Sequence, residues 1–311
     1  MKIITKSDNS RRRVAAVGMY DGVHAGHKFL IDYLRLEASA RGLAPSVITF
    51  SHHPLSVVRP LEAPGLLTSL EERLRRLGAS GAEDIIILNF NDRLRYKSAR
   101  DFLAMLHKSY GIDTLVLGFN NRFGHDRPGS LEEYRAIGEE VGVEVIPAPE
   151  YRGAGSPVSS SIIRRHLLSG APEKAAEALG HPYGLRGIVV RGEQLGRSLG
   201  FPTANVSIPD KDLLIPKPGA YAAFVVTPDG KRRPAMVNIG FRPTVSDPDA
   251  QAILSIEAHI LDYTGYLYDE EVTVEFMQFL RPERRFASVE KLREQLAHDA
   301  AAVRKILSPK D

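Results

Sequence analysis

The sequence predicts two domains of different class, a parallel α/β domain followed by a small antiparallel β-barrel of the six-stranded type that a C-terminal helix covers. Apolar segments alternate with helical patterns over the first half of the chain, which is typical of βαβ crossovers and a parallel sheet. Beyond residue 183, strand patterns follow one another without helices between them. At 311 residues the chain is also long for one hydrophobic core, so two domains are expected.

The composition is typical of a globular protein that binds small anionic molecules. Hydrophobic residues make up 43% of the chain and charged residues 25%, and we expect no transmembrane helix. The formal net charge of +3 and the isoelectric point near 9.0 are mildly basic. The basic clusters, which we expect to be solvated, are residues 11–13 and Arg73, Arg75 and Arg76. Because no aromatic residues are interleaved with them, we expect neither a nucleic-acid partner nor a membrane partner.

The N-terminal residues and the cysteine content bear on the compartment. Residues 1–8 lack the apolar core of a signal peptide, and the chain has no cysteine for a disulfide framework. The sequence therefore predicts a cytoplasmic protein. It leaves the oligomeric state open, with a homo-oligomer as one alternative.

The first domain, placed at residues 1–182, is predicted to be a Rossmann-like α/β sheet. Its predicted strands lie at 14–17, 46–50, 84–89, 114–118 and 144–147. Its predicted helices lie at 28–34, 69–78, 98–110 and 131–141. Because ligands of parallel sheets bind outside the carboxyl ends of the strands, the residues that follow the strands are candidates for the site.

The segment 18–27, Gly-Met-Tyr-Asp-Gly-Val-His-Ala-Gly-His, joins the first predicted strand to a helix. The first amides of a helix lack internal partners and carry the positive end of its dipole, so this turn is suited to phosphate. Gly18, Gly22 and Gly26 let the backbone approach a ligand closely. His24 and His27 lie side by side in the first turn, where they can donate hydrogen bonds to charge that builds up as a phosphate bond breaks. A metal-binding pair and ordinary helix-cap histidines are the alternatives.

Three further segments place polar residues where strands or loops end. Residues 50–54, Phe-Ser-His-His-Pro, end the second strand with two histidines. Residues 118–124, Gly-Phe-Asn-Asn-Arg-Phe-Gly, follow the fourth strand, where an Asn-rich turn is the alternative to a binding loop. Ser160 caps a predicted short helix and Arg164 follows one turn later, which makes a second phosphate clamp. A plain serine N-cap is the alternative there.

The second domain, placed at residues 183–311, follows a short helix predicted within residues 172–183, which glycine and proline end. Its predicted strands lie at 184–191, 220–227, 233–240, 253–261 and 271–279, with a hairpin turn at 228–230. Closure of these strands into a barrel removes exposed edges. In the predicted helix at 288–307 apolar residues recur every three or four positions, and we expect this stripe to serve packing alone.

The segment 187–205 carries the chemistry of the second domain. Gly192, Gly196 and Gly200 are spaced by four residues and offer backbone amides to phosphates. No Gly-Lys-Ser/Thr follows, so this is not a Walker A loop. Thr203 and Asn205 present two hard oxygen ligands, which suits Mg²⁺ bridging two phosphates. A simple turn is the alternative.

Taken together, these motifs resemble one known family. The segment 18–27 resembles the signature of the nucleotidyltransferase superfamily, in the form of the bacterial bifunctional riboflavin kinase/FMN adenylyltransferase (FAD synthetase) family. The segment 187–205 resembles the riboflavin kinase signature nearly letter for letter, and segments 238–244 and 255–261 agree with it. The departures from the family pattern are His52 for proline, Asn120 and Asn121 for Asp and Phe, and Ser161 for threonine. The resemblance covers almost the whole chain.

The resemblance implies that the barrel phosphorylates riboflavin to FMN and that the N-terminal domain adenylylates FMN to FAD, both with ATP and Mg²⁺. It implies that Glu257 accepts the proton of the ribityl hydroxyl, although a solvated strand residue is the alternative. The implied nucleotide-binding residues are Gly18, Asp21, Gly22, His24, Gly26, His27, Ser160, Arg164, Gly192, Gly196, Arg197 and Gly200, and of these His24 and His27 are also catalytic. The implied flavin-binding residues are His53, Asn120, Phe123 and Arg281, and the implied magnesium ligands are Thr203 and Asn205.

Two functions of other classes fit parts of the sequence. One is a flavin-binding or regulatory module in which one domain has lost catalysis, which the altered residues Asn120 and Asn121 support. The other is a nucleotidyltransferase with a single activity on a different substrate, which leaves the Pro-Thr-Ala-Asn barrel segment unexplained. Products formed from riboflavin, ATP and Mg²⁺ distinguish the three functions.

Overall fold

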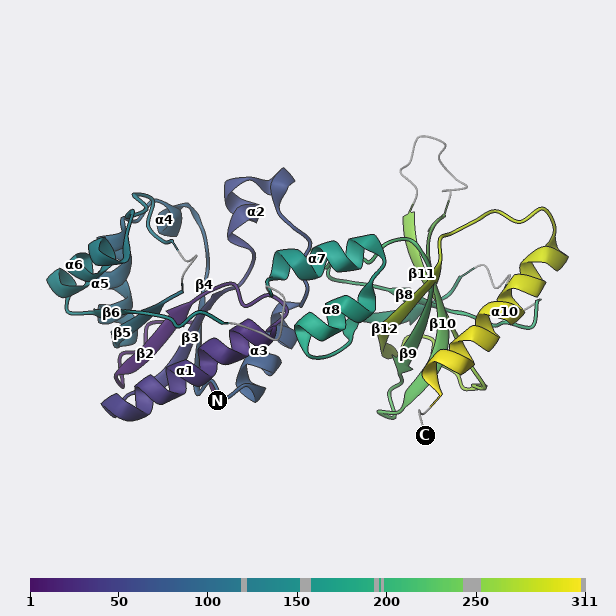
Figure 1. Ribbon diagram of the computed structural model, residues 1–311, viewed down its shortest axis with the longest axis horizontal. Coiled ribbons are helices and arrows are strands. Elements are labelled where there is room, and N and C mark those ends of the chain that lie inside the picture. The colour runs from purple at the N-terminus through teal and green to yellow at the C-terminus, as the bar shows by residue number, and fades with distance from the viewer. Residues whose placement is uncertain (119–121, 152–157, 193–195, 197–198, 243–252, 309–311) are drawn as a thin grey trace. The chain divides into compact units, whose positions relative to one another are not determined.

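The computed structural model describes residues 1–118, 122–151, 158–192, 196, 199–242 and 253–308. The chain forms two compact units, Met1–Ser160 and Ser161–Asp311. The first holds a six-stranded parallel sheet and the second a closed antiparallel barrel, so both predicted fold classes are confirmed (Figure 1). Within the described ranges, no helix is long and apolar enough to cross a membrane.

The sheet of the first unit has the strand order β1-β4-β3-β2-β5-β6, and neighbouring strands run parallel. The strands are β1 (Lys2–Ile4), β2 (Arg13–Val17), β3 (Ala44–Phe50), β4 (Asp84–Leu88), β5 (Ile112–Leu117) and β6 (Glu144–Pro147). Strands β2 and β3 are buried along their whole length, as expected of parallel strands that helices cover on both faces. Strand β1 is not among the predicted strands, because a three-residue edge strand carries too short a pattern.

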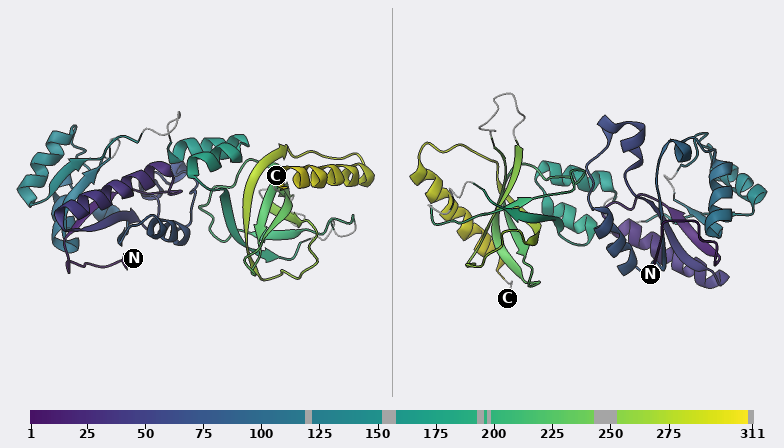
Figure 2. Two further views of the ribbon diagram at one scale, coloured as in Figure 1. Left: turned by 60° about the horizontal axis from the view of Figure 1, so that its bottom comes forward. Right: turned by 180° about the vertical axis from the view of Figure 1, so that it is seen from behind.

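Helices cover both faces of this sheet (Figure 2). The helical elements of this unit are α1 (Ala25–Arg41), α2 (Pro54–Val58), the 3₁₀ turn η1 (Pro60–Glu62), α3 (Leu70–Ala79), α4 (Asp92–Arg95), α5 (Ala99–Tyr110) and α6 (Leu131–Val141). Because side chains of a strand alternate between faces, Val14 and Ala16 pack with α1 and α3, whereas Ala15 packs with α5 and α6. The carboxyl ends of β2, β3 and β5 therefore share one edge between the two helical layers.

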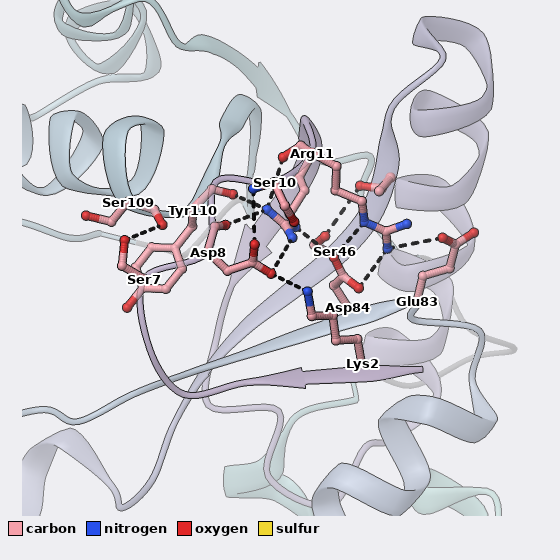
Figure 3. Close-up of polar contacts among 12 residues, drawn as sticks. Lys2, Ser7, Asp8, Ser10, Arg11, Ser46, Glu83, Asp84, Ser109 and Tyr110 are labelled. Carbon is pink, nitrogen blue, oxygen red and sulfur yellow. Dashed lines mark hydrogen bonds and ion pairs between the residues drawn. The ribbon is translucent and has the colours of Figure 1, made fainter.

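A buried ionic network lies at the opposite edge, where β2 and β4 begin. The Asp84 carboxylate, 1% exposed, accepts hydrogen bonds from Nε of Arg13 at 2.7 Å and from Nε of Arg11 at 2.9 Å. The Arg13 side chain is fully buried, and its guanidinium also reaches Asp8 at 3.2 Å. Figure 3 shows Asp8, Arg11 and Asp84 in this network. The prediction that the arginine clusters are solvated is wrong for Arg13, and also for Arg73, because both side chains are buried and hydrogen-bonded.

Replacing Asp84 by alanine is expected to lower the free energy of unfolding by about 3–5 kcal/mol, because it leaves the buried Arg13 guanidinium without its carboxylate. Asp113 pairs with the half-exposed Arg12 at 3.2 Å and is the matched control. Asp113→Ala should cost less than about 1 kcal/mol. Urea unfolding of the two variants measures the difference, and equal losses would contradict this account of the network.

The described residues of the second unit form a barrel and helices. The elements are α7 (Ser160–Ser169, which begins one residue before the unit), α8 (Pro172–Leu179), β7 (Tyr183–Val190), β8 (Ala204–Ser207), β9 (Gly219–Val226), β10 (Arg232–Arg242), β11 (Ile253–Ile260), β12 (Glu271–Arg281) and α10 (Val289–Leu307). The barrel order is β10-β11-β8-β7-β12-β9, closed by the pairing of β10 with β9. Strand β8 is not among the predicted strands, because it has only four residues and begins within the Pro-Thr-Ala-Asn segment, which also fits a turn.

The division into compact units falls earlier in the chain than the predicted boundary between residues 182 and 183. The reason is that α8 packs against β12 and β7 of the barrel. Its buried residues Ala175 and Leu179 face that contact as part of an amphipathic helix. Helix α8 therefore belongs structurally to the barrel.

Candidate active sites

The loop between β2 and α1 has a backbone that few sequences adopt. Tyr20, Gly22 and Val23 have φ values of 52°, 82° and 42°, in the left-handed region. A Cβ atom at Gly26 would lie 3.3 Å from the His24 ring, so a side chain there would crowd the imidazole. A Cβ at Gly18 would similarly lie 3.2 Å from the Tyr20 ring. These constraints hold the predicted phosphate-binding turn at the amino end of α1.

His24 and His27 lie together at this helix end. His24 is the N-cap residue of α1, and the two imidazole rings stack with centroids 3.6 Å apart and planes 17° apart. The Nδ1 atoms of both rings are buried and have no hydrogen-bond partner among the described residues. Buried polar atoms without partners are uncommon and often indicate a missing ligand. The stacking of the two rings confirms that His24 and His27 lie side by side, as the sequence predicts.

Burial controls the charge of both histidines. Desolvation lowers the pKa of His24 to about 4, and desolvation together with the neighbouring His24 lowers the pKa of His27 well below 6.5. Both rings are therefore neutral at neutral pH in the ligand-free protein. Each neutral ring carries one N–H donor and one acceptor nitrogen.

Acidification from about pH 7.5 to about pH 5.5 is expected to lower the stability of the first unit by about 1 kcal/mol for each of these histidines. Below pH 6.5 the unfolded chain binds protons that the folded chain does not, whereas above pH 6.5 both states are neutral and the full stability is present. Urea unfolding at both pH values measures the loss. The double variant His24→Gln/His27→Gln should lose less stability on acidification, because it lacks both titrating groups. If it lost as much stability as the wild type, the two histidines would not be the cause.

Asp21 occupies a structural position within the loop. Its buried carboxylate accepts hydrogen bonds from the amide of Leu67 at 2.9 Å and from the amide and hydroxyl of Thr68 at 3.1 and 3.2 Å. The Thr68 hydroxyl also accepts from the Gly22 amide at 3.2 Å. The structure thus directs the Asp21 carboxylate into the protein, where it ties the loop to residues 67 and 68.

Ser160, one of the two predicted phosphate-binding residues of α7, contacts the same loop. The Ser160 hydroxyl, in the first turn of α7, donates to the main-chain carbonyl of Asp21 at 2.9 Å. Arg164 lies one turn further along α7 and is half-buried. The structure therefore brings Ser160 to the phosphate-binding turn.

A cavity of about 720 Å³ opens at the carboxyl ends of β2 and β3. Its walls are largely apolar and aromatic, including Phe50, Phe90 and Phe123, and His53 lies among them. Its cationic and imidazole lining residues are His53, Arg95, Lys97, Arg122, His125 and Arg127, and none of the described residues that line it is acidic. An apolar cavity with a basic lining suits an aromatic ligand that carries a phosphate.

The predicted flavin residues of the first unit have different positions. His53 is the N-cap residue of α2, and its Nδ1 accepts from the Leu55 amide at 3.1 Å. His52, the departure from the family pattern, bonds through Nε2 to the Phe90 carbonyl at 2.8 Å and so links the ends of β3 and β4. Asn120 and Asn121 lie outside the described residues.

Arg73, for which the sequence predicts a solvated side chain, contacts two residues that line this cavity. Its guanidinium donates to the Phe50 carbonyl at 2.6 Å and lies 3.5 Å from the Met19 sulfur. Phe50 and Met19 both line the cavity. The sequence gives little indication that Arg73 is buried. The spacing of Arg73, Arg75 and Arg76 does not show which of the three side chains points into the protein.

In the barrel, strand pairing brings the predicted magnesium and catalytic residues together. Strand β8 pairs antiparallel with β11, and this register places Asn205 directly opposite Glu257. The Thr203 hydroxyl lies 3.5 Å from the Glu257 carboxylate. The side chains of Thr203 and Asn205 thus form one cluster of hard oxygen ligands with Glu257, which lies more than fifty residues later in the sequence.

Gly192 and Gly196 lie against this cluster. A Cβ atom at Gly192 would lie 2.1 Å from the Asn205 amide nitrogen, and one at Gly196 would lie 2.4 Å from the Phe201 carbonyl oxygen. Only glycine permits such close approach. Gly200 has φ of 84°, which glycine adopts without strain. Arg197 lies outside the described residues.

A cavity of about 760 Å³ extends from Glu257 and Thr203 to Arg281 and the residues that follow it. The Arg281 guanidinium donates to the Asp299 carboxylate at 2.7 and 3.0 Å, and Asp299 is 4% exposed. Leu292 and Leu296 of α10 line the same cavity. Leu296 of the predicted apolar stripe also packs against the hydrophobic cluster of the barrel, as expected. The apolar pattern gives no sign of Asp299, because this residue lies outside it.

Two family models match the chain, FAD synthetase over residues 6–162 and riboflavin kinase over residues 179–307. The chain is 37% identical to the bifunctional riboflavin kinase/FMN adenylyltransferase of Pseudomonas fluorescens over 297 residues, which cover 95% of this chain and 93% of that protein. It is 35% identical to the Escherichia coli (strain K12) protein of the same description over 292 residues, which cover 94% and 91%. A solved structure described as a macrolide-efflux protein from Streptococcus pneumoniae matches with a TM-score of 0.86 and 28% identity, covering 97% of this chain and 98% of that one. The chain therefore belongs to the bifunctional riboflavin kinase/FMN adenylyltransferase family, and its two matched regions carry the two activities.

Proposed function

We propose that riboflavin is phosphorylated at the Glu257 cluster of the barrel. Glu257 accepts the proton of the ribityl 5′-hydroxyl, whose oxygen attacks the γ-phosphorus of ATP. The bond from that phosphorus to the bridging oxygen breaks, and FMN and ADP result. The observation that supports this assignment most is the register of β8 and β11, which sets Asn205 opposite Glu257.

The two barrel cavities fit the two substrates of this reaction. The cavity of about 760 Å³ has apolar walls formed by Phe201, Met236 and Phe286 and would take the isoalloxazine ring. A smaller cavity of about 230 Å³ also has Thr203 in its lining, together with Tyr266 and Tyr268. It would take the adenosine half of ATP, with the phosphates on the glycine loop that contains Gly192, Gly196, Arg197 and Gly200.

The barrel site also fits Mg²⁺. Thr203 and Asn205 offer hard oxygen atoms next to the Glu257 carboxylate, and the described residues contain no cluster of three His, Cys, Asp or Glu side chains. Mg²⁺ is usually bound by few protein ligands together with water and substrate phosphates, so a sparse oxygen site is suitable. When bound there, Mg²⁺ would neutralise phosphate charge.

In the first unit we assign adenylylation to the turn that begins α1. A phosphate oxygen of FMN attacks the α-phosphorus of ATP, the bond to the bridging α–β oxygen breaks, and pyrophosphate leaves. His24 and His27 donate hydrogen bonds to the developing charge, while Ser160 and Arg164 hold phosphates. His53, Asn120 and Phe123 contact the flavin, and Asp21 acts indirectly by fixing the loop through Thr68.

The remaining parts of the proposal concern the chain as a whole. The functional boundary lies between residues 182 and 183, and the enzyme works in the cytoplasm. Light scattering measures whether the protein forms a homo-oligomer. Purified protein incubated with riboflavin, ATP and Mg²⁺ should form FMN first and then FAD. FMN without FAD would contradict adenylylation in the first unit, and neither product would contradict the whole assignment.

A further inference from the structure

Residues 122–127 form one wall of the cavity in the first unit. Arg122, Phe123, Gly124, His125 and Arg127 all line it. This segment joins β5 to α6 and contains no helix or strand of its own. Its position must therefore come from contacts with neighbouring elements.

Tyr134, on α6, holds the Phe123 main chain with a single hydroxyl group. The hydroxyl donates to the Phe123 carbonyl at 2.8 Å and accepts from the Phe123 amide at 3.0 Å. The Tyr134 side chain is 0% exposed, so water does not compete for these bonds. One buried side chain thus satisfies both main-chain groups of a cavity residue.

The Phe123 ring is held by the same residue. It contacts the Tyr134 ring at a centroid distance of 4.6 Å and the Phe102 ring at 5.1 Å. The next turn of the segment is fixed separately, because the His125 amide donates to the Lys97 carbonyl at 2.9 Å and the Ala99 amide donates to Asp126 at 2.8 Å. Tyr134 therefore fixes the start of the segment, and Lys97 and Ala99, at the amino end of α5, fix its end.

We propose that Tyr134 is a positioning residue for FMN in adenylylation, through its hold on Phe123. It does not line the cavity itself, and it fixes the wall against which the isoalloxazine ring packs. This inference rests on the proposed function, because it requires this cavity to be the FMN site. The hydroxyl orders this wall in the ligand-free protein, so the entropy lost on ordering it does not reduce the binding free energy of the flavin.

Tyr134→Phe tests the proposal, because it keeps the ring and removes the oxygen that serves both main-chain groups. We expect the KM for FMN to rise about tenfold, with kcat and the KM for ATP changed by less than about twofold. Riboflavin phosphorylation by the same preparation should be unchanged. A smaller folded fraction would lower kcat but not raise a KM, so a purely structural role gives a different result.

Tyr110→Phe is the matched control. Tyr110 is half-buried, packs against the same hydrophobic cluster, and has a hydroxyl for which the described residues provide no hydrogen bond. Its removal should leave the KM for FMN unchanged. An unchanged KM in Tyr134→Phe would overturn the proposal.

Lys97→Ala distinguishes a wrong role for Tyr134 from a wrong location of the FMN site. The Lys97 side chain lines the cavity, whereas the bond to His125 uses the main chain and survives the substitution. If Lys97→Ala raises the KM for FMN and Tyr134→Phe does not, the cavity binds FMN and the role of Tyr134 is wrong. If neither variant changes it, FMN binds elsewhere and both assignments fail.

Discussion

Replacing Glu257 by glutamine is expected to slow FMN formation by about 10²–10⁴-fold, the range for loss of a general base. Glutamine has nearly the same shape and cannot accept the proton of the ribityl hydroxyl. Adenylylation of supplied FMN should proceed at the wild-type rate, because the first unit has its own nucleotide turn. Chromatography of FMN and FAD formed from riboflavin or from supplied FMN measures the two reactions separately.

Glu271→Gln is the control for this experiment. Glu271 lies on β12 of the same barrel and pairs with Arg186 at 2.6 Å, with both side chains half-exposed. Its substitution makes the same chemical change outside the cluster, and we expect FMN formation within about twofold of wild type. If Glu257→Gln in a folded protein slowed both reactions equally, the separation of the chemistries between the units would be wrong.

Replacing His27 by alanine is expected to slow FAD formation from FMN by about 10²–10³-fold, the effect of removing one donor from developing charge. The ring stacks on His24 at 3.6 Å, so its loss also frees His24 to move. Phosphorylation of riboflavin should be unaffected. The rate of pyrophosphate release with FMN and ATP measures the loss.

The control for this second experiment is His107→Ala. His107 lies on α5 and bonds through Nδ1 to the Ile112 carbonyl at 3.1 Å, at the amino end of β5 and away from the nucleotide turn. FAD formation in this variant should stay close to wild type. A loss as large as that of His27→Ala would indicate that adenylylation responds to general disturbance of the unit.

The sequence was informative where chemistry lies in contiguous segments. The turn at 18–27 and the segment 187–205 each combine a backbone requirement with reactive side chains, so both could be identified without a structure. Glu257 could be assigned only through the family resemblance, because a lone glutamate on a strand gives no sign of its partners. The strand register that places it opposite Asn205 comes from the closed barrel.

Several assignments depend on which way a side chain points. Arg73 and Arg13 were expected to be solvated, yet both are buried, because neighbouring arginines on a helix or strand face different directions. Asp21 belongs to the nucleotide motif, but its carboxylate turns to the amides of residues 67 and 68. Asp299 and Tyr134 lie on helices whose sequence pattern indicates only packing.

By itself, the sequence determined the two fold classes, the order of the longer strands and helices, and the family, since these depend on periodicity and on short motifs. It gave no sign of the short elements β1, β8, α2, η1 and α4. Tertiary structure alone decided which polar residues meet, including Glu257 with Thr203, Arg281 with Asp299, and Tyr134 with Phe123. It also decided that α8 packs on the barrel. The physical reason is that such pairs join residues distant in the chain, and their distances are set by sheet register and helix packing, which no local pattern encodes.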